Sequence, residues 1–413
     1  MRVLMVSWEY PPLLYGGLGR HVQGLSEALA ADGHDVAVIS QAGPGTLDDD
    51  RTPRGVRVVR VPSPPRRDDF ARWVARLNRA QARAGRTLLR SWRPDVVHAH
   101  DWVAAAAGVS IARAAGMPLV ATIHATEAGL WNGWLTKPLS RKRHDMEAWL
   151  VREAARTIVC SAAMREEVSA ALAVPTNDLV QVHNAVDPAA WHTTGRQRDE
   201  IRHRAGIPAD APLLVLAGRV EWEKGGDIAV RALPHIRRAH PGTNLVIAGS
   251  GSQRPALTDL ARRQRVARAV RLTGHLDQPA VAALLGTADV ALVPSSYEPF
   301  GLVALEASAA GTPVVAGAAG GLPEIVTHGE NGLLVPPRDP RALADAVTGL
   351  LADPDYAAGL VRTAQRAIEA WYVWPITARE TEKVYDEAVA DPRPPRPRPR
   401  PVRPGNVFTG ERT

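Results

Sequence analysis

Short apolar runs alternate with helix-length amphipathic segments along almost the whole chain. The runs are rich in Val, Ile and Leu and are apolar throughout, rather than alternating with polar residues. Continuous hydrophobicity of this kind indicates strands that are covered on both faces, as in a parallel sheet with crossover helices. The runs fall at residues 2–6, 36–39, 95–98, 119–123, 156–159, 179–182, 213–217, 245–248, 270–272, 290–293, 313–315 and 332–335.

The number of strand–helix units is too large for a single sheet. At 413 residues the chain fits an α/β fold of two Rossmann-like, doubly wound domains. An Asp-Pro step and a Thr-Thr-Gly-Arg stretch interrupt the pattern near residues 187–202. We therefore expect one domain over residues 1–190, a second over residues 191–370, a helix over residues 371–390 that packs back on the first domain, and a disordered Pro/Arg tail over residues 391–413.

Charge, cysteine content and hydropathy exclude several classes of protein. More than half of the formal net charge of +7 comes from the Pro/Arg tail, and no RNA- or DNA-binding motif accompanies it, so nucleic acid is not an expected partner. Cys160 is alone and cannot form an internal disulfide. The N-terminus is charged too early for a signal peptide, and no segment offers the roughly 20 apolar residues of a membrane span. These features predict a cytoplasmic protein.

A glycine-rich segment follows the first strand, at the edge where open parallel sheets bind ligands. A loop rich in proline and aromatic residues leads to Gly16, Gly17 and Gly19 at the start of a helix, where backbone amides favour anionic oxygens. A dinucleotide fingerprint would place its glycines directly after the strand, so a nicotinamide cofactor is not expected. A glycine-rich turn that binds nothing is the alternative.

Two cations follow the first strand of the second domain. Arg219 and Lys224 lie five residues apart across a tight turn. Cations that converge at a strand end suit a diphosphate, and they would stabilise the negative charge that builds on a nucleotide leaving group. A pair of solvated surface charges is the alternative.

A carboxylate pair brackets a predicted helix start in the same domain. Pro299 and Gly301 favour a helix that begins just after a strand and a loop, with Glu298 before its first turn and Glu306 about two turns inside. The amides between the two carboxylates can meet sugar or phosphate oxygens; they belong to Phe300, Gly301, Leu302 and Val303. We predict that Glu298 binds sugar hydroxyls and that Glu306 binds a ribose diol, whereas a solvated acidic helix is the alternative.

Taken together, these motifs resemble the family 4 glycosyltransferases, whose architecture is called GT-B and consists of two Rossmann-like domains facing across a cleft. The matching pieces run nearly from end to end; they are Gly16-Gly17, Gly218-Arg219, Lys224-Gly225, Gly249-Ser250-Gly251, the segment from Glu298 to Glu306, and Gly320-Gly321-Leu322-Pro323-Glu324. The resemblance implies a retaining transferase that attacks from the face on which the nucleotide leaves. It also implies that the protein supplies positioning and charge stabilisation rather than a nucleophile.

The resemblance also implies roles for individual residues. Arg219 and Lys224 grip the donor diphosphate, Glu306 binds the ribose, and Glu298 with the amides of the following helix holds the transferred sugar. Gly17 closes on the donor from the other domain, Gly249 belongs to the donor site, and His124 contacts the donor sugar. The catalytic set implied in this way comprises Glu298, His124, Arg219 and Lys224.

The N-terminal half is similar to bacterial α-1,4-glucosyltransferases that build glycogen or methylglucose polysaccharide. The similarity lies in Ser7-Trp8-Glu9-Tyr10-Pro11-Pro12, in His98-Ala99-His100-Asp101-Trp102 and in Thr122-Ile123-His124-Ala125-Thr126-Glu127. By this analogy Asp101 faces the acceptor, a glucan, and the donor is UDP-glucose or ADP-glucose. One departure is Ala185 in His183-Asn184-Ala185, where the family usually has Asn-Gly.

No cofactor and no metal ion are expected, since two cations can neutralise the diphosphate. The acidic cluster Asp48, Asp49 and Asp50 lies in a Gly/Pro/Thr segment and is interpreted as a solvated loop. His98 and His100 flank Ala99 on a strand and are expected to point to opposite faces, which disfavours joint ligation of an ion.

A stripe of arginines marks one predicted helix. Between Asp68 and the last of these arginines, the apolar side is supplied by Phe70, Trp73, Leu77, Ala80, Ala84 and Leu88. The stripe consists of Arg72, Arg76, Arg79, Arg83, Arg86 and Arg90. We interpret it as a solvated helix face; the alternative is a peripheral contact with the anionic inner surface of a membrane, or with a charged acceptor.

Three other functions stay open from the sequence. The same transfer onto a lipid, inositol or small-glycoside acceptor would leave every motif unchanged. A nucleotide-sugar epimerase of the same fold would not need the Glu298–Glu306 pattern. A sugar-nucleotide sensor without catalysis is disfavoured, because every expected donor contact is present.

Overall fold

The computed structural model describes residues 1–65 and 69–392 and divides them into two compact units. The first unit comprises Met1–Asn184 together with the chain from Trp374 onward, and the second comprises Ala185–Val373. Both predicted boundaries, after residues 190 and 370, lie within the second unit. The chain enters and leaves the second unit through two adjacent segments. Val186 lies against Val373, and the N–H of Val186 donates to the carbonyl of Tyr372 over 2.9 Å.

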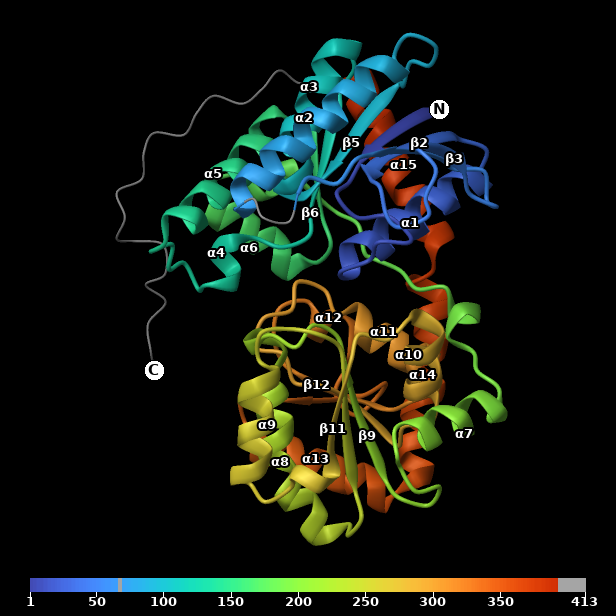
Figure 1. The fold of residues 1–413 in the computed structure, drawn as a ribbon, viewed down its shortest axis with the longest axis vertical. Coiled ribbons are helices and arrows are strands. Elements are labelled where there is room, and N and C mark those ends of the chain that lie inside the picture. The colour runs from blue at the N-terminus through green and yellow to red at the C-terminus, as the bar shows by residue number, and fades with distance from the viewer. Residues whose placement is uncertain (66–68, 393–413) are drawn as a thin grey trace. The chain divides into compact units, whose positions relative to one another are not determined.

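The N-terminal unit is built on an eight-stranded sheet of order β3-β4-β2-β1-β5-β6-β7-β8 (Figure 1). Its strands are β1 (Arg2–Val6), β2 (Asp35–Gln41), β3 (Asp49–Arg51), β4 (Arg57–Val61), β5 (Val96–His100), β6 (Leu119–Ile123), β7 (Arg156–Val159) and β8 (Leu179–Gln181). All pairs are parallel except β3 with β4. The helices are α1 (Gly17–Ala31), α2 (Phe70–Leu88), α3 (Asp101–Ala115), α4 (Glu127–Leu130), α5 (Pro138–Glu153), α6 (Ala162–Leu172) and α15 (Trp374–Ala390).

The C-terminal unit holds a fully parallel sheet of order β11-β10-β9-β12-β13-β14, which is the doubly wound Rossmann order. Its strands are β9 (Leu213–Ala217), β10 (Asn244–Ala248), β11 (Val270–Gly274), β12 (Val290–Val293), β13 (Val314–Gly317) and β14 (Leu333–Val335). The helices are α7 (Gly195–Arg204), α8 (Gly226–Ala239), α9 (Arg254–Arg263), α10 (Gln278–Gly286), α11 (Leu302–Ala309), α12 (Leu322–Ile325), α13 (Pro340–Ala352) and α14 (Pro354–Trp371). The predicted fold class, two Rossmann-like parallel-sheet domains, is confirmed.

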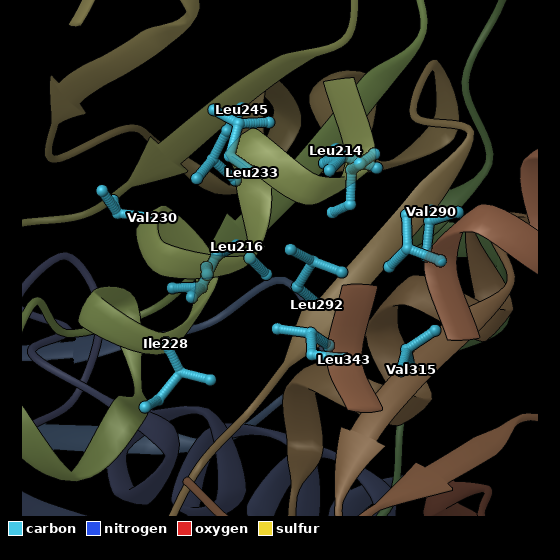
Figure 2. Packing of buried hydrophobic residues seen from close by; sticks show 14 of the residues in the cluster. Leu214, Leu216, Ile228, Val230, Leu233, Leu245, Val290, Leu292, Val315 and Leu343 are labelled. Carbon is cyan, nitrogen blue, oxygen red and sulfur yellow. The ribbon is translucent and has the colours of Figure 1, made fainter. Parts of the chain in front are cut away.

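Continuous apolar strands fill the core of the C-terminal unit, as their sequences predict. Leu214 and Leu216 on β9 pack with Val290 and Leu292 on β12 beneath the helices α8 and α13 (Figure 2). Every one of these side chains is almost completely buried. Among the described residues no helix has the length and hydropathy needed to cross a bilayer.

The acidic cluster at residues 48–50 is not the loop that the sequence analysis expected. Asp49 lies in the short antiparallel edge strand β3, opposite β4, and its carboxylate accepts a hydrogen bond from Arg57 Nε over 2.9 Å. This ion pair lowers the pKa of Asp49. The continuous-run pattern missed both strands, because arginines interrupt the valines of β4 and β3 consists of exposed charged residues.

The buried face of α2 matches the predicted one in part, since Leu77 and Leu88 are buried as expected. The arginine stripe is exposed as expected, but Phe70, Trp73, Ala80 and Ala84 stay partly exposed. Polar residues take their place in the core: Asn78 Nδ2 donates to the carbonyls of Val74 and Val103, and Gln81 Nε2 donates to that of Ser7. A pattern built on apolar residues alone could not identify this face, because hydrogen bonds make the burial of these amides possible.

Helix α15 completes the N-terminal unit from the far end of the chain. It packs along α1 (Figure 1), where Gly24 lies directly against the indole of Trp374. Tyr385 is fully buried and shares a 2.7 Å hydrogen bond with His98 Nδ1. The terminal element expected at residues 371–390 therefore lies on the first unit, while the predicted tail beyond residue 392 falls outside the described residues.

Replacing Gly24 with Ala should destabilise the protein, because the new methyl would collide with Trp374 and α15 would have to shift. We expect a loss of about 1–3 kcal/mol in the free energy of unfolding. The matched control is Gly349→Ala on α13, where an added Cβ meets no heavy atom within 4 Å; it should gain about 0.4–1 kcal/mol. Urea denaturation followed by tryptophan fluorescence measures both, and equal effects of the two substitutions would contradict the packing described for α15.

Candidate active site

The C-terminal unit places its predicted site residues on loops that follow neighbouring strands. Lys224, after β9, forms an ion pair with Glu298, after β12, with 2.7 Å between Nζ and Oε2. The hydroxyl of Ser295 donates to the same carboxylate oxygen over 3.0 Å. A backbone bond from Ser296 N to the carbonyl of Glu223, 2.8 Å, joins the same two loops. The structure therefore brings Lys224 and Glu298 together, as the sequence predicts for a shared site.

Arg219 and Lys224 line one pocket of about 400 Å³ at the carboxyl ends of β9 and β10, together with Trp222 and Arg338. Arg219 Nη2 bonds to the buried carboxylate of Glu223 over 2.9 Å, while more than half of the Arg219 side chain stays exposed. The guanidinium of Arg338 lies 5.9 Å from the centre of the Trp222 ring. The pocket thus combines two cations with an aromatic–guanidinium pair, a combination suited to an anionic ligand that carries a flat ring.

Two glycines let the strand-end loops approach one another. Gly249, at the end of β10, has a φ of 150°, and a Cβ there would collide with the carbonyl of Gly218. Gly225 has a φ of 70°, and a Cβ there would collide with the carbonyl of Pro294. Glycine at these positions has a structural reason, and the donor contact predicted for Gly249 is a further expectation.

Helix α11 begins where the sequence predicted. Gly301, with a φ of 112°, is its N-cap residue and offers no side-chain cap to the first turn. The first turn of any helix has N–H groups without an intrahelical acceptor, and here they belong to Leu302 and Val303. Phe300 is buried and packs against Tyr372. Glu306 is buried inside α11, and neither it nor Glu298 is among the residues that line the 400 Å³ pocket.

In the N-terminal unit, Glu9 organises the glycine-rich loop. Its Oε2 accepts hydrogen bonds from the amides of Tyr15, 2.7 Å, and Gly16, 3.1 Å. These two amides therefore bind an internal carboxylate instead of an external anion, contrary to one use expected for the loop. A Cβ at Gly19 would collide with Leu14 and Glu9, so this glycine also serves packing. Gly17, the first residue of α1, stays exposed.

Asp101 and His124 lie side by side at the ends of β5 and β6. Asp101 has a φ of 59° at the strand-to-helix turn, and its Oδ1 accepts a hydrogen bond from the His124 amide over 2.7 Å. Burial raises the pKa of Asp101 to about 7 in spite of this bond. The family resemblance implied separate roles for these two residues, and the structure shows that they are in contact.

The expectation that His98 and His100 point to opposite faces is wrong. Residues two apart on a strand share a face, and the two rings lie 4.1 Å apart. His100 Nδ1 lies 3.3 Å from His124 Nε2, and His21 Nδ1 bonds to Asn184 Oδ1 over 2.7 Å. Burial lowers the pKa of His21 to about 4 and that of His98 to about 3, and it also lowers those of His100 and His124. These imidazoles are therefore neutral at pH 7.

Two members of this cluster, His21 and Asn184, were not predicted as site residues from the sequence. They are separated by 163 positions and meet because the segment that follows β8 brings Asn184 next to α1. A histidine four residues after Gly17, on the inner side of α1, was the one available signal, and it is indistinguishable from a core histidine.

Five aromatic side chains form a continuous row beside Asp101, which the sequence analysis also did not predict. Tyr15 stacks on Trp8 with 5.1 Å between ring centres, and Trp8 meets Trp73 edge-on at 6.0 Å. Phe70 stacks on Trp73 and meets Trp102 edge-on, both at 5.8 Å. More than a third of Phe70 and half of Tyr15 are exposed. We call these residues the aromatic row.

Models of two known families match the chain. The one described as Glycosyltransferase Family 4 matches residues 15–190, and the one described as Glycosyl transferases group 1 matches residues 197–367. A glycogen synthase from Mycobacterium tuberculosis is 46% identical over 96% of this chain and 97% of its own. A D-inositol 3-phosphate glycosyltransferase from Xylanimonas cellulosilytica is 34% identical over 94% and 97%. The solved structure of sucrose-phosphate synthase from Thermosynechococcus elongatus has a TM-score of 0.81 at 25% identity, covering 94% of this chain and 99% of that one.

Asp101 predicts a pH dependence of stability. Its folded pKa of about 7 lies above the ordinary value, so the folded protein binds the proton more tightly than the unfolded chain does. Stability from this group is therefore present at low pH and is lost as the pH rises through 7. We expect that Asp101→Asn loses less free energy of unfolding between pH 5 and pH 8 than the wild type, as measured by urea denaturation.

The control for this comparison is Asp210→Asn, which removes an equal charge at an exposed position. Burial also raises the pKa of Glu147, to about 8, and this carboxyl contributes a loss of the same sign to all three proteins. An Asp101→Asn protein whose stability falls with pH as steeply as that of the control would contradict the assignment to Asp101.

Proposed function

The chain belongs to the family 4 glycosyltransferases, and from this we propose that it transfers glucose from UDP-glucose or ADP-glucose to an α-1,4-glucan with retention of the anomeric configuration. The relative named glycogen synthase, which matches nearly end to end, supports the sugar and the acceptor. The aromatic row is the observation on this chain that carries the choice of acceptor. Aromatic rings offer flat, apolar and electron-rich faces to the C–H groups of successive sugar rings.

The donor half of the proposal rests on charge. A nucleotide diphosphate would enter the pocket lined by Arg219 and Lys224, with its base toward Trp222 and Arg338. The two cations stabilise the charge that grows on the departing phosphate, and the first-turn amides of α11 add to it. Glu298, already bound to Lys224, is positioned to accept hydrogen bonds from hydroxyls of the sugar. We infer that Glu306 binds the ribose and that Gly17 and Gly249 contribute backbone contacts to the donor.

The acceptor half rests on groups that burial leaves neutral or only partly ionised at pH 7. Asp101 and His124 lie at the strand ends next to the aromatic row, since Trp102 follows Asp101 directly. A hydroxyl nucleophile carries no charge, so a site in which burial suppresses ionisation suits it better than a fully charged one. In the retaining mechanism a phosphate oxygen of the leaving nucleotide takes the acceptor proton, and no protein base is needed. We propose that the reaction uses no metal ion, because Arg219 and Lys224 supply the positive charge.

A second acceptor is inositol phosphate, which the relative named D-inositol 3-phosphate glycosyltransferase favours at lower identity. Lipid and small-glycoside acceptors are further alternatives, whereas membership of this family favours transfer over epimerisation or sensing. We interpret the exposed arginines of α2 as a solvated helix face, and a peripheral contact with an anionic membrane is the alternative.

Product analysis tests the reaction directly. The protein is incubated with UDP-glucose or ADP-glucose and with a glucan primer, inositol phosphate or a lipid acceptor, in the presence and absence of a chelator. We expect a longer α-1,4-glucan, released nucleoside diphosphate and an unchanged rate with the chelator. Transfer to inositol phosphate alone would replace the glucan proposal, and a rate abolished by the chelator would overturn metal independence.

Substitution of Lys224 tests the donor half. We expect Lys224→Ala to lower kcat by about 10²–10³-fold, because a charge-stabilising donor is lost and Glu298 is left without its cation. Lys224→Arg, which keeps the charge, should retain more activity. Steady-state kinetics measure the change, and the control Arg362→Ala on α14 removes an exposed charge elsewhere. Full activity of Lys224→Ala would exclude the proposed contact between Lys224 and the donor diphosphate.

Substitution of the aromatic row tests the acceptor half. We expect Tyr15→Ala or Trp73→Ala to raise the KM for long glucan primers roughly fivefold, the effect of losing about 1 kcal/mol of ring contact, with kcat little changed. The KM for the nucleotide sugar should stay constant. Trp371→Ala, at a tryptophan that is 67% exposed in the other unit, is the matched control. Equal KM values for short and long primers in wild type and variants would remove the row from the acceptor site.

A further inference from the structure

Three buried histidines from three separate elements converge in the N-terminal unit. They are His21 on α1, His100 at the end of β5 and His124 just after β6. One ring nitrogen from each lies within 4.8 Å of the other two. The ring centres of His21 and His124 are 4.7 Å apart, and those of His21 and His100 are 5.4 Å apart. This is the ligand type and number that transition-metal sites in proteins use.

The hydrogen bond to Asn184 fixes the tautomer of His21. A carboxamide oxygen can only accept, so the 2.7 Å contact makes Nδ1 of His21 the donor and leaves the lone pair on Nε2. Nε2 is buried and has no hydrogen-bond partner in the part of the chain that the structure describes. An unsatisfied buried nitrogen needs an explanation. A metal-binding histidine normally donates its other N–H to an oxygen in this way, which orients the ring.

The pair formed by His100 and His124 has a matching geometry. Nδ1 of His100 and Nε2 of His124 lie 3.3 Å apart. Zinc–nitrogen bonds of about 2.0–2.1 Å in a tetrahedral site separate two ligand nitrogens by about 3.3–3.4 Å. One N–H between two neutral imidazoles would also produce this distance. That explanation leaves Nε2 of His21 without a partner, whereas a shared ion accounts for all three nitrogens.

We propose that His21, His100 and His124 form a binding site for one divalent transition-metal ion of the zinc class, with Asn184 orienting His21 from behind. Imidazole nitrogens favour Zn²⁺, Ni²⁺ and Cu²⁺, whereas Mg²⁺ and Ca²⁺ take oxygen ligands. The site is distinct from the diphosphate-binding residues, which all lie in the C-terminal unit.

The bound ion inhibits sugar transfer rather than assisting it. An ion held by His124 removes that side chain from the contact with the donor sugar that the family resemblance implies for it, so sugar transfer falls as the site fills. This consequence rests on the proposed function, whereas binding of the ion does not. The metal-independent reaction and the metal site are compatible, because the reaction runs when the site is empty of ions.

The test titrates metal-free, full-length protein with Zn²⁺ by calorimetry and repeats it with Co²⁺, whose visible absorption reports tetrahedral nitrogen ligation. We expect one Zn²⁺ per chain and none with Mg²⁺. His100→Gln and His21→Gln should abolish this binding, and Asn184→Ala should weaken it by about 10–100-fold, the usual effect of removing an outer partner. His203→Gln, at an exposed histidine of α7, is the matched control and should bind as the wild type does.

Circular dichroism melts show whether each variant is folded. A Gln variant that is unfolded is replaced by the Asn substitution at the same position. Failure of the wild type to bind Zn²⁺, or equal binding by wild type and His21→Gln, would overturn the site. Sugar transfer that Zn²⁺ inhibits and a chelator restores supports the inhibitory role. Zinc binding without any sugar transfer would leave the site intact and overturn the proposed function, so the two failures are distinguishable.

Discussion

Lys224 and Glu298 form an ion pair across the ends of two neighbouring parallel strands, and the donor half of the site is arranged around it. Both side chains are largely removed from water, so either one alone would be a poorly solvated charge. Their loops are also joined through the backbone of Ser296 and Glu223. A ligand that enters the 400 Å³ pocket therefore meets the ammonium of Lys224, which the carboxylate of Glu298 already orients, whereas Glu298 itself does not line that pocket.

The two units keep their ionisable groups in different states. In the C-terminal unit, pairing with carboxylates accommodates Arg219 and Lys224 as charges. In the N-terminal unit, burial keeps the histidine cluster neutral and raises the pKa of Asp101. This division follows the chemistry proposed for the substrates, since a diphosphate is anionic and an acceptor hydroxyl is not. Local dielectric and partners, rather than residue type, decide which state a side chain takes.

The sequence predicted most features that depend on local pattern. Continuous apolar runs gave the parallel strands, and Pro299 with Gly301 predicted the start of α11. The family resemblance singled out Asp101 and His124 separately, and their contact is seen only in the structure. Features that depend on distant pairs were missed: Asn184 reaches His21 across 163 positions, and the aromatic row gathers rings from three segments, which are the loop after β1, α2 and α3. The error over His98 and His100 was of another kind, since the period of a strand already puts them on one face.

Packing, as well as ligand binding, requires glycine at several motif positions in this chain. Gly249 permits the contact between the β9 and β10 loops, and Gly16 has its amide bound to Glu9. A functional motif can therefore be intact for reasons that act before any substrate arrives, because the loops must first approach one another closely enough to form the pocket. The residues whose types packing does not explain are the stronger evidence for function. By that criterion Arg219 and Tyr15 are stronger evidence for substrate binding than the glycines beside them. Both side chains are about half exposed, and neither is required to build the core.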